Sequence, residues 1–395
     1  SAASDVYKRQ ELIESYNTHT DPFIASNSTL HMAFDDNENL WVGTFFGGLQ
    51  FIDLKNHHVE IYKHSDLDTN SISADVIWYV FIDSKKQIWL GTQLGISRFD
   101  KETKKFTNFN SHNSAIKNEN VRVIYEDKRG DYWFGSEDAL YRYDSNGQFH
   151  EYTHDIKDHQ SICNNWIVTI SEDNNGELWF GSYGGGISKY NYLEDNFCSW
   201  NEGDGLCNDF VCGILVDELN DLWISTFKGL SHFKQKSQTF KTYHTEDGLQ
   251  GDKFSINSFH KSIDGTLMFG GVNGLSTFHP NLISSNTFPP KVVLTDFRLL
   301  NKSVDLMSED APIDKHISHV KTIELPHDYS VFTIHFASLN FIQSNKNQYA
   351  YRLVGFDKKW NYVGNKNEAT YTNLAPGKYT CLLYTSPSPR DKRQS

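Results

Sequence analysis

Short runs of alternating apolar and polar residues fill most of the chain, and glycine-rich turns separate them. The clearest run is Leu178–Asn191, which predicts a strand, a glycine turn and a second strand. The same pattern recurs at Leu40–Asp53, Ile88–Asp100, Tyr132–Asp144, Leu222–Phe233 and Leu267–His279. The second position of each hairpin is tryptophan, or Met268 in the last, at intervals of 48, 44, 46, 44 and 45 residues. One β-hairpin per period of about 45 residues predicts an array of β repeats.

One complete period shows the strands expected of each repeat. Val76–Ile82 is apolar and β-branched, which predicts a buried innermost strand. Ile88–Thr92 and Ile96–Asp100 form the hairpin, and Lys105–Asn110 supplies an outer fourth strand. Four antiparallel strands per period are typical of a β-propeller blade. Six blades are visible, and the sixth lacks a clear fourth strand. Leu12–Thr18 resembles an outer strand that could close the ring on the last blade, but we expect the six blades to come from a seven-bladed ring.

An aspartate recurs six residues before the blade tryptophan. The members of this row are Asp83, Asp127, Asp173 and Asp217. A carboxylate at this place can accept hydrogen bonds from turn amides. Because the residue repeats from blade to blade, we interpret it as structural rather than as a row of catalytic or metal-binding acids. The tryptophans likewise fit core packing between blades, where each buried ring contributes about 1.5–3 kcal/mol.

Composition narrows the classes of function. Lys and Arg number 37 against 50 Asp and Glu, a formal charge of −13, which argues against binding to nucleic acid or anionic membranes. No run of 18 apolar residues is present. The five cysteines lack metal-type spacing and are interpreted as small buried side chains. No cofactor or metal is predicted, although Asp173–Gly176 is loosely calcium-like and leaves Ca²⁺ binding open.

A second all-β segment follows the repeats. It opens with the chain's one Pro-Pro pair, at Pro289, and carries turn signals at Gly355–Asp357 and Pro376-Gly377, which predicts a β-sandwich. We therefore expect the propeller over residues 11–285 and the sandwich over residues 286–381. Residues 1–10 and 382–395 break the pattern of their neighbours and resemble translated sequencing-adapter sequence. We expect both tails to lie outside the fold and the sandwich to lack its last strand.

The motifs carry a family resemblance. The blade signature Leu-Trp-x-Gly-Thr/Ser-x-x-Gly-Leu/Ile resembles the two-component regulator propeller repeat. Tyr351–Asp357, Trp360 and Ala369–Tyr379 resemble the Y_Y_Y domain, an immunoglobulin-like sandwich. Together the two resemblances cover nearly all of residues 11–380. Ser225 replaces a signature glycine and Met268 a tryptophan, so we expect some irregularity in the fifth and sixth blades.

The resemblance implies the periplasmic sensor region of a Bacteroidetes-type hybrid two-component system. Such a region would bind an oligosaccharide or another small ligand. It would relay the signal through the Y_Y_Y domain, as a homodimer, to a transmembrane helix and to histidine kinase and regulator domains further along. No kinase histidine box or phosphate-binding loop occurs here, so the segment itself is not expected to be an enzyme. Its sandwich tyrosines, Tyr351, Tyr371 and Tyr379, are expected to pack the core.

A ligand would bind where the hairpin turns and the starts of the inner strands surround the channel of the propeller. An oligosaccharide site combines an aromatic surface with amide and charged groups. The candidates are Tyr183, Trp166, Asn165, Arg122, Trp78 and Phe45. The first three lie in one blade and Arg122 lies in the blade before it. Ordinary packing is the alternative for each, and for Trp78 above all.

Two other functions fit a propeller: a glycan-active enzyme and a scaffold that binds another protein. Ser262–Thr266 resembles the aspartate-box hairpin of sialidases, but that hairpin is structural. A sialidase-type site needs clustered arginines, whereas residues 11–285 hold four: Arg98, Arg122, Arg129 and Arg142. Arg98 and Arg142 occupy equivalent third-strand positions, which favours packing. A retaining glycosidase would need two carboxylates about 5 Å apart.

Overall fold

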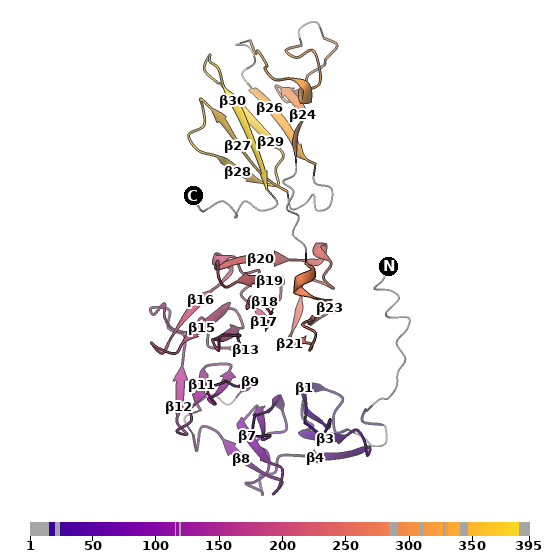
Figure 1. The fold of residues 1–395 in the computed structure, drawn as a ribbon, viewed down its shortest axis with the longest axis vertical. Coiled ribbons are helices and arrows are strands. Elements are labelled where there is room, and N and C mark those ends of the chain that lie inside the picture. Colours follow the sequence, from indigo (N-terminus) through magenta and orange to yellow (C-terminus); the bar gives the residue numbers. More distant parts are fainter. Residues whose placement is uncertain are drawn as a thin grey trace. The chain divides into compact units, whose positions relative to one another are not determined.

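The computed structural model describes residues 16–19, 24–114, 116–117, 120–283, 291–308, 311–326, 329, 331–339 and 347–386. The chain divides into two compact units, residues 1–283 and 284–395. The described residues are nearly all β, with four short 3₁₀ helices (Figure 1). None of the helices in this part of the chain has the length and apolar character needed to cross a membrane. The predicted tail over residues 1–10 and the predicted boundary at residues 285 and 286 lie outside the described residues.

Six antiparallel sheets follow one another in the first unit, five with four strands and the last with three (Figure 1). Their strands are β1 Thr29–Phe34, β2 Leu40–Thr44, β3 Leu49–Asp53 and β4 His58–Tyr62; β5 Ile77–Ile82, β6 Ile88–Thr92, β7 Gly95–Asp100 and β8 Lys105–Phe109; β9 Val121–Glu126, β10 Tyr132–Ser136, β11 Leu140–Tyr143 and β12 Phe149–Tyr152; β13 Ile167–Glu172, β14 Leu178–Ser182, β15 Ile187–Asn191 and β16 Asn196–Trp200; β17 Val211–Val216, β18 Leu222–Thr226, β19 Gly229–Lys234 and β20 Thr239–Tyr243; β21 Phe254–Lys261, β22 Leu267–Gly271 and β23 Gly274–Phe278. The innermost strands β1, β5, β9, β13, β17 and β21 each contact the next. The predicted propeller is confirmed, and the second sheet matches the predicted period to within one residue at each strand end.

The blade tryptophans fill the space between consecutive sheets, as predicted. Trp41, Trp89, Trp133, Trp179 and Trp223 are each at most 4% exposed. Trp133, for example, lies in one core cluster with residues of the following blade, and its ring centroid is 5.2 Å from that of Phe180. The repeated tryptophan therefore holds neighbouring blades together and is not available as a surface for a ligand.

The row of aspartates is also structural. Asp127 Oδ1 accepts hydrogen bonds from the backbone N–H groups of Arg129 at 2.9 Å and Asp131 at 3.0 Å. Its Oδ2 accepts the indole N–H of Trp133 at 2.9 Å. The aspartates of the first five blades, Asp35 included, make the same set of bonds. Each carboxylate thus fixes its turn and orients the tryptophan six residues further on.

The first and last blades each leave one face uncovered by a neighbouring blade. Met32 is 53% exposed, although the equivalent Val80 and Ile124, on the innermost strands of the next two blades, are 1% exposed. Met268, in the tryptophan position of the sixth blade, is likewise only partly buried. Strands β1 and β21 make no contact comparable with those between consecutive inner strands. The described residues of the first unit form no seventh sheet, so the seven-bladed ring stays a prediction.

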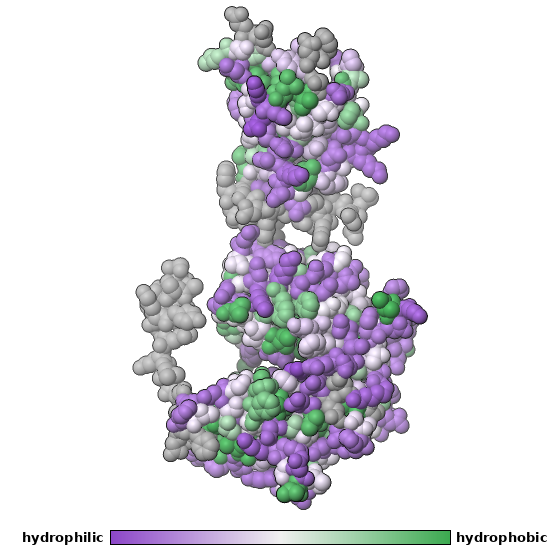
Figure 2. Space-filling view, turned by 180° about the vertical axis from the view of Figure 1, so that it is seen from behind, coloured by the Kyte–Doolittle hydropathy of each residue, from purple (hydrophilic) through white to green (hydrophobic). Residues whose placement is uncertain are grey.

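The fifth blade is regular, contrary to the expectation from Ser225. Its four strands pair in order, and β17 and β18 have the same one-residue bulge that the inner pairs of the other four-stranded blades carry. The sixth blade is irregular as expected, with three strands and a wider interruption between Phe254 and Phe259. Figure 2 shows that hydrophilic residues cover most of the visible surface, as the charge of −13 suggests.

The second unit contains two facing sheets. One has the order β25-β24-β26-β29 and the other β28-β27-β30. The strands are β24 Val292–Leu299, β25 Lys302–Ser303, β26 Val331–Ser338, β27 Gln348–Val354, β28 Asn361–Gly364, β29 Glu368–Thr372 and β30 Thr380–Ser386. Phe336, Tyr349, Leu353, Ala369 and Tyr371 form the buried core between the sheets.

Strand β30 corrects the expectation that the sandwich ends near Thr380. It pairs with β27 along its whole length, from Thr380 opposite Val354 to Ser386 opposite Gln348. Alternation explains why these residues fit a strand, because Cys381 and Leu383 both pack against the core cluster. Residues 382–386 are therefore part of the fold.

The sandwich tyrosines differ in burial. Tyr371 is 4% exposed, as predicted for a core residue, and its hydroxyl donates a hydrogen bond to Asp357 Oδ2 at 2.7 Å. Tyr351 and Tyr379 are partly buried against the same core cluster. Tyr351 meets Tyr371 edge to face at 5.9 Å between ring centroids. Tyrosine thus forms both the centre and the margin of this core.

Candidate ligand-binding site

Equivalent positions in the blades bring the candidate side chains to one end of the sheets. The residue after the second strand donates its backbone N–H to the residue just before the innermost strand. This bond joins Tyr183 to Trp166 at 2.9 Å and Phe227 to Phe210 at 3.1 Å. The same bond recurs at the turn residues Phe45 and Gln93. Side chains at these positions therefore lie at the hairpin-turn end of neighbouring blades.

Four aromatic side chains from the fourth and fifth blades form what we call the aromatic cluster: Trp166, Tyr183, Phe210 and Phe227. The centroid of the Tyr183 ring lies 4.2 Å from Trp166, 4.8 Å from Phe210 and 5.7 Å from Phe227. Phe210 and Phe227 are stacked, with 5° between their planes. Lys253, from the sixth blade, places its Nζ 5.1 Å from the centroid of Phe227. Phe210 is 36% exposed, so the cluster offers an apolar surface to a ligand.

A glycine turn holds Tyr183 in place. Gly184 and Gly186 have φ of +103° and +83°, which favour glycine, and both donate backbone hydrogen bonds to the carbonyl oxygen of Asp209 in the next blade, at 3.1 and 3.0 Å. A Cβ at Gly186 would lie 2.2 Å from the carbonyl oxygen of Trp200. The turn is therefore rigid, and it links two blades beneath the aromatic cluster.

A second group, which we call the cationic cluster, comprises Phe45, Trp78, Asn120, Arg122 and Glu137 from the first three blades. The guanidinium carbon of Arg122 lies 3.5 Å from the centroid of Trp78, a close cation–π contact. Arg122 also forms an ion pair with Glu137, with its Nε 3.0 Å from Oε1. Trp78 donates its indole N–H to Asn120 Oδ1 at 3.1 Å, and Phe45 lies 6.1 Å from Trp78 between ring centroids.

The predicted residues do not share one site: five of them divide between these two clusters, and Asn165 belongs to neither. Tyr183 and Trp166 meet as predicted, whereas Arg122 lies with Trp78 and Phe45. Asn165 belongs to the loop between blades, where its Oδ1 accepts the backbone N–H of His154 at 2.5 Å. Asp75 makes the equivalent bond to His64 at 2.8 Å, so the contact of Asn165 is a repeated feature of the connection.

Phe210 and Lys253 escape prediction from the sequence. A usable signal exists, since each immediately precedes an innermost strand, as Trp166 does. An alignment of the repeats selects Trp166 and Phe210, each 13 residues before its blade tryptophan, whereas Lys253 lies 15 residues before Met268 and breaks that spacing. Single residues at the start of a strand do not stand out when the blades are considered one at a time.

The chemistry available near these clusters favours binding over catalysis. Glu137 is the one carboxylate among the named members of the two clusters, and it is paired with Arg122. Nearby, Cys207 Sγ lies 3.9 Å from His244 Nε2, whose Nδ1 is 3.7 Å from Asp252. However, the Cys207 thiol donates to the Lys228 carbonyl oxygen at 2.8 Å, and burial raises its pKa to about 11. A protonated thiol is a poor nucleophile, so this group of side chains does not support covalent catalysis.

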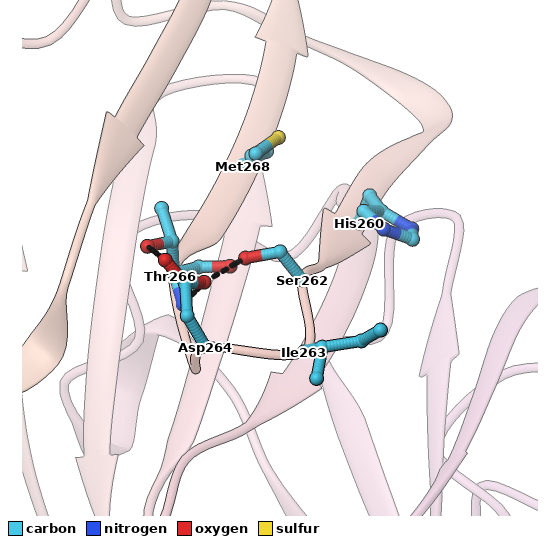
Figure 3. Close-up of a pocket in the computed structure, with 6 residues that line it drawn as sticks. All are labelled: His260, Ser262, Ile263, Asp264, Thr266 and Met268. Atoms are coloured by element: carbon cyan, nitrogen blue, oxygen red, sulfur yellow. Dashed lines mark hydrogen bonds between the residues drawn. The ribbon is translucent and has the colours of Figure 1, made fainter.

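A shallow depression of about 510 Å³ lies on the sixth blade, lined by Met268 and the turn between β21 and β22 (Figure 3). Asp264 accepts the backbone N–H and the hydroxyl of Thr266, both at 3.1 Å, which makes this hairpin structural, as predicted. Ile263 is fully exposed at the tip of the turn. Because this turn is at the opposite end of the sheet from the β22–β23 turn, the depression is separate from the two clusters.

Family models match both units. Residues 115–138 and 161–184 match the two component regulator propeller, and residues 340–393 match the Y_Y_Y domain. The chain combines regulator propeller repeats with a Y_Y_Y domain. The second regulator match contains Trp166 and Tyr183, so half of the aromatic cluster lies on a recognised repeat. The Y_Y_Y match contains β27 to β30.

The chain is also similar to a protein of known sequence and to solved structures. The chain is 30% identical to histidine kinase P4 of Formosa agariphila over 384 residues, which is 95% of this chain and 28% of that protein. A structure described as the extracellular domain of a hybrid two-component system from B. thetaiotaomicron is 21% identical, with a TM-score of 0.55, over 94% of this chain and 50% of that one. Virginiamycin B lyase from Staphylococcus aureus is 16% identical, with a TM-score of 0.50, over 67% of this chain and 84% of that one.

These similarities support different conclusions. The two structural matches show the fold. The two family models match segments of the regulator propeller and of the Y_Y_Y domain, and the kinase match relates the chain to part of a histidine kinase. The chain spans little more than a quarter of the length of the kinase that it matches.

Proposed function

We propose that this regulator propeller senses an oligosaccharide in the periplasm for a hybrid two-component system. The observation that carries the proposal is the partly exposed aromatic cluster at the hairpin-turn end of the blades, with Tyr183 in contact with three other rings. Sugar rings present apolar C–H faces that stack on aromatic side chains, and their hydroxyl groups bind charged and amide groups at the margin.

Pre-organisation supports this proposal. The backbone bonds from Gly184 and Gly186 to Asp209 hold the turn before any ligand arrives. A rigid aromatic surface loses little conformational entropy on binding, so more of the contact energy remains as affinity. Lys253 at the margin of the cluster offers a charge for a hydroxyl or an acidic group of the sugar. With a net charge of −13, nucleic acid is a poor alternative ligand.

The signal would leave through the Y_Y_Y domain. We propose that two chains associate through their sandwich domains and that the ligand favours one of two arrangements of this homodimer. Only a difference in affinity between the two arrangements can shift their populations. A transmembrane helix further along the parent protein would carry the change to kinase and regulator domains, and the segment itself would catalyse no reaction.

Calorimetric titration with a panel of oligosaccharides tests the proposal. We expect one glycan class to bind the wild type, and Tyr183→Ala and Phe210→Ala to weaken binding at least tenfold. Arg122→Ala is the matched control, because it alters the cationic cluster in other blades. Loss of binding in Arg122→Ala with unchanged affinity in Tyr183→Ala would move the site to the cationic cluster. Unchanged affinity in all three variants would remove both assignments.

A further inference from the structure

One position of the repeat changes its chemistry in the fifth blade. On the third strand, the residue facing the blade tryptophan is Arg98, Arg142 or Lys189 in the second to fourth blades. Each cation lies 5.5–5.8 Å from the centroid of its tryptophan. In the fifth blade this residue is His232, whose ring stacks on Trp223 at 4.2 Å with 5° between the planes.

The carboxylates that face this position are retained. Arg142 Nε lies 3.9 Å from Asp131 Oδ2, and Lys189 Nζ lies 3.2 Å from Glu177 Oε2. In the fifth blade, His232 Nε2 lies 3.3 Å from Asp221 Oδ2 and 3.9 Å from Asp217 Oδ2. This nitrogen is fully buried and has no hydrogen-bond partner among the described residues. Two acids thus face a largely buried imidazole where the second to fourth blades have a permanent cation.

Asp217 also lacks a contact that the other aspartates of its row have. In each of the first four blades, Oδ2 of this aspartate meets the blade tryptophan and a second polar group from the following blade. These groups belong to Lys101 for Asp35, Tyr132 for Asp83, Tyr192 for Asp127 and Asn220 for Asp173. Asp217 Oδ2 accepts the Trp223 indole at 2.9 Å, and no described donor of the sixth blade reaches it. One acceptor site on this buried oxygen is therefore left over.

We propose that Asp217, Asp221 and His232 bind a divalent transition-metal ion of the Zn²⁺ class. Their donor atoms all lie within 4.8 Å of one another. An ion about 2.1 Å from two such atoms in tetrahedral geometry holds them about 3.4 Å apart. The observed separations of 3.3 and 3.9 Å are close to that value. Imidazole and carboxylate together suit zinc and its neighbours, and a water molecule would complete the four-coordinate shell.

The ion would supply the positive charge that Arg142 and Lys189 bring to their own blades. The proposed role is structural: the metal ties the third strand to the β17–β18 turn, at the end of the blade away from the aromatic cluster. It does not depend on the proposed sensing function.

Titration of the metal-free protein with Zn²⁺ and Co²⁺ tests this site. We expect one equivalent to bind with a Kd in the micromolar range or below, a higher thermal midpoint with Zn²⁺, and a visible absorption band with Co²⁺. His232→Arg restores the cation of the third blade, so it should fold normally and bind at least tenfold more weakly. Asp221→Asn provides a second loss variant if His232→Arg does not fold.

Cys207→Ser is the control for adventitious binding, because Cys207 and His244 form a thiol–imidazole pair on the same blade. This variant should bind Zn²⁺ as the wild type does. The proposal is overturned if the wild type binds no metal, if His232→Arg and Asp221→Asn bind it with wild-type affinity, or if Cys207→Ser loses it.

Discussion

Gly213 and Ser225 face each other across strands β17 and β18, and this pair reverses the arrangement of the other four-stranded blades. There the glycine is on the second strand, as in the pairs of Tyr79 with Gly91 and Val123 with Gly135. A Cβ at Gly91 would lie 2.6 Å from the carbonyl oxygen of Val121 in the next blade. Each four-stranded blade thus keeps one glycine in this pair, where neighbouring blades approach most closely.

We predict that Gly213→Val destabilises the propeller by about 1–3 kcal/mol, as overpacking does in a rigid interior. A Cβ at Gly213 would lie 2.1 Å from Cδ1 of Phe259, whose ring occupies that space. Ser225→Gly, the matched change on the facing strand, should lower the free energy of unfolding by less than about 1 kcal/mol, the usual cost of a glycine within a strand. Urea denaturation followed by circular dichroism measures the free energy of unfolding of both variants. Equal effects would contradict the conclusion that Gly213 takes the place of the second-strand glycine of the other blades.

Asp127→Ala tests the aspartate row. It removes the acceptor of two turn amides, the Trp133 indole and the Tyr192 hydroxyl, which bonds Oδ2 at 2.9 Å from the next blade. Leaving buried donors unpaired should lower the free energy of unfolding by about 2–4 kcal/mol. Asp66→Ala is the control, since that side chain is 96% exposed and should cost less than about 0.5 kcal/mol. A small loss for Asp127→Ala would show that the turn holds without its carboxylate.

Periodicity explains how much of the propeller could be predicted. The tryptophan and aspartate positions, such as Trp133 and Asp127, recur at a fixed spacing because every blade packs against its neighbours in the same way. One repeat therefore predicts the structure of the others. The exchange of glycine between Ser225 and Gly213 was beyond that reasoning, because it depends on which residues face each other across two strands. Strand β30 escapes prediction because the unusual composition of residues 382–395 is a stronger signal in the sequence than the alternation of apolar residues at Cys381 and Leu383.

The candidate site was harder to predict than the fold. The sequence favours Tyr183 and Trp166 because both are aromatic and lie in one blade. Arg122 lies apart from them because its guanidinium group contacts Trp78 of the preceding blade, at 3.5 Å from the ring centroid. Contacts between side chains of different blades leave no periodic signal in the sequence. The repeat therefore locates the end of the propeller where a ligand could bind, but it does not identify the residues that share a surface.

Cysteine reactivity should report the burial of the propeller core. Cys198 is exposed, whereas Cys212 is fully buried and burial raises its pKa to about 12. Because the thiolate is the reactive form, we expect a thiol reagent at pH 8 to modify Cys198 within minutes and Cys212 only on unfolding. Peptide mass spectrometry after timed labelling distinguishes the sites, and Cys198→Ser should abolish the fast phase. Fast labelling of Cys212 in the folded protein would contradict its position in the core.

The last prediction concerns the pH dependence of the Y_Y_Y domain. Burial alone would raise the pKa of Asp357, but hydrogen bonds from the Leu353 N–H and the Tyr371 hydroxyl, both at 2.7 Å, outweigh it and hold the pKa below its ordinary value. Burial, and then the same carboxylate, raise the pKa of Tyr371. The stabilisation from this pair should therefore be complete between about pH 5 and pH 9. This range lies above the ordinary pKa of an aspartate, about 3.9, and below that of a tyrosine, about 10.

Below about pH 4 this stabilisation is lost as Asp357 is protonated, and above about pH 10 it is lost as Tyr371 ionises. Tyr371→Phe removes one bond to the carboxylate, so it should lower local stability at pH 7 by about 1 kcal/mol. It should also reduce the acid loss, because the pKa of Asp357 returns toward its ordinary value. Hydrogen exchange of residues 348–372, corrected for the intrinsic rate at each pH, measures both effects. Tyr362→Phe, at a side chain that is 65% exposed, should leave the profile unchanged. An unaltered profile in Tyr371→Phe would mean that the backbone bond from Leu353 holds Asp357 by itself.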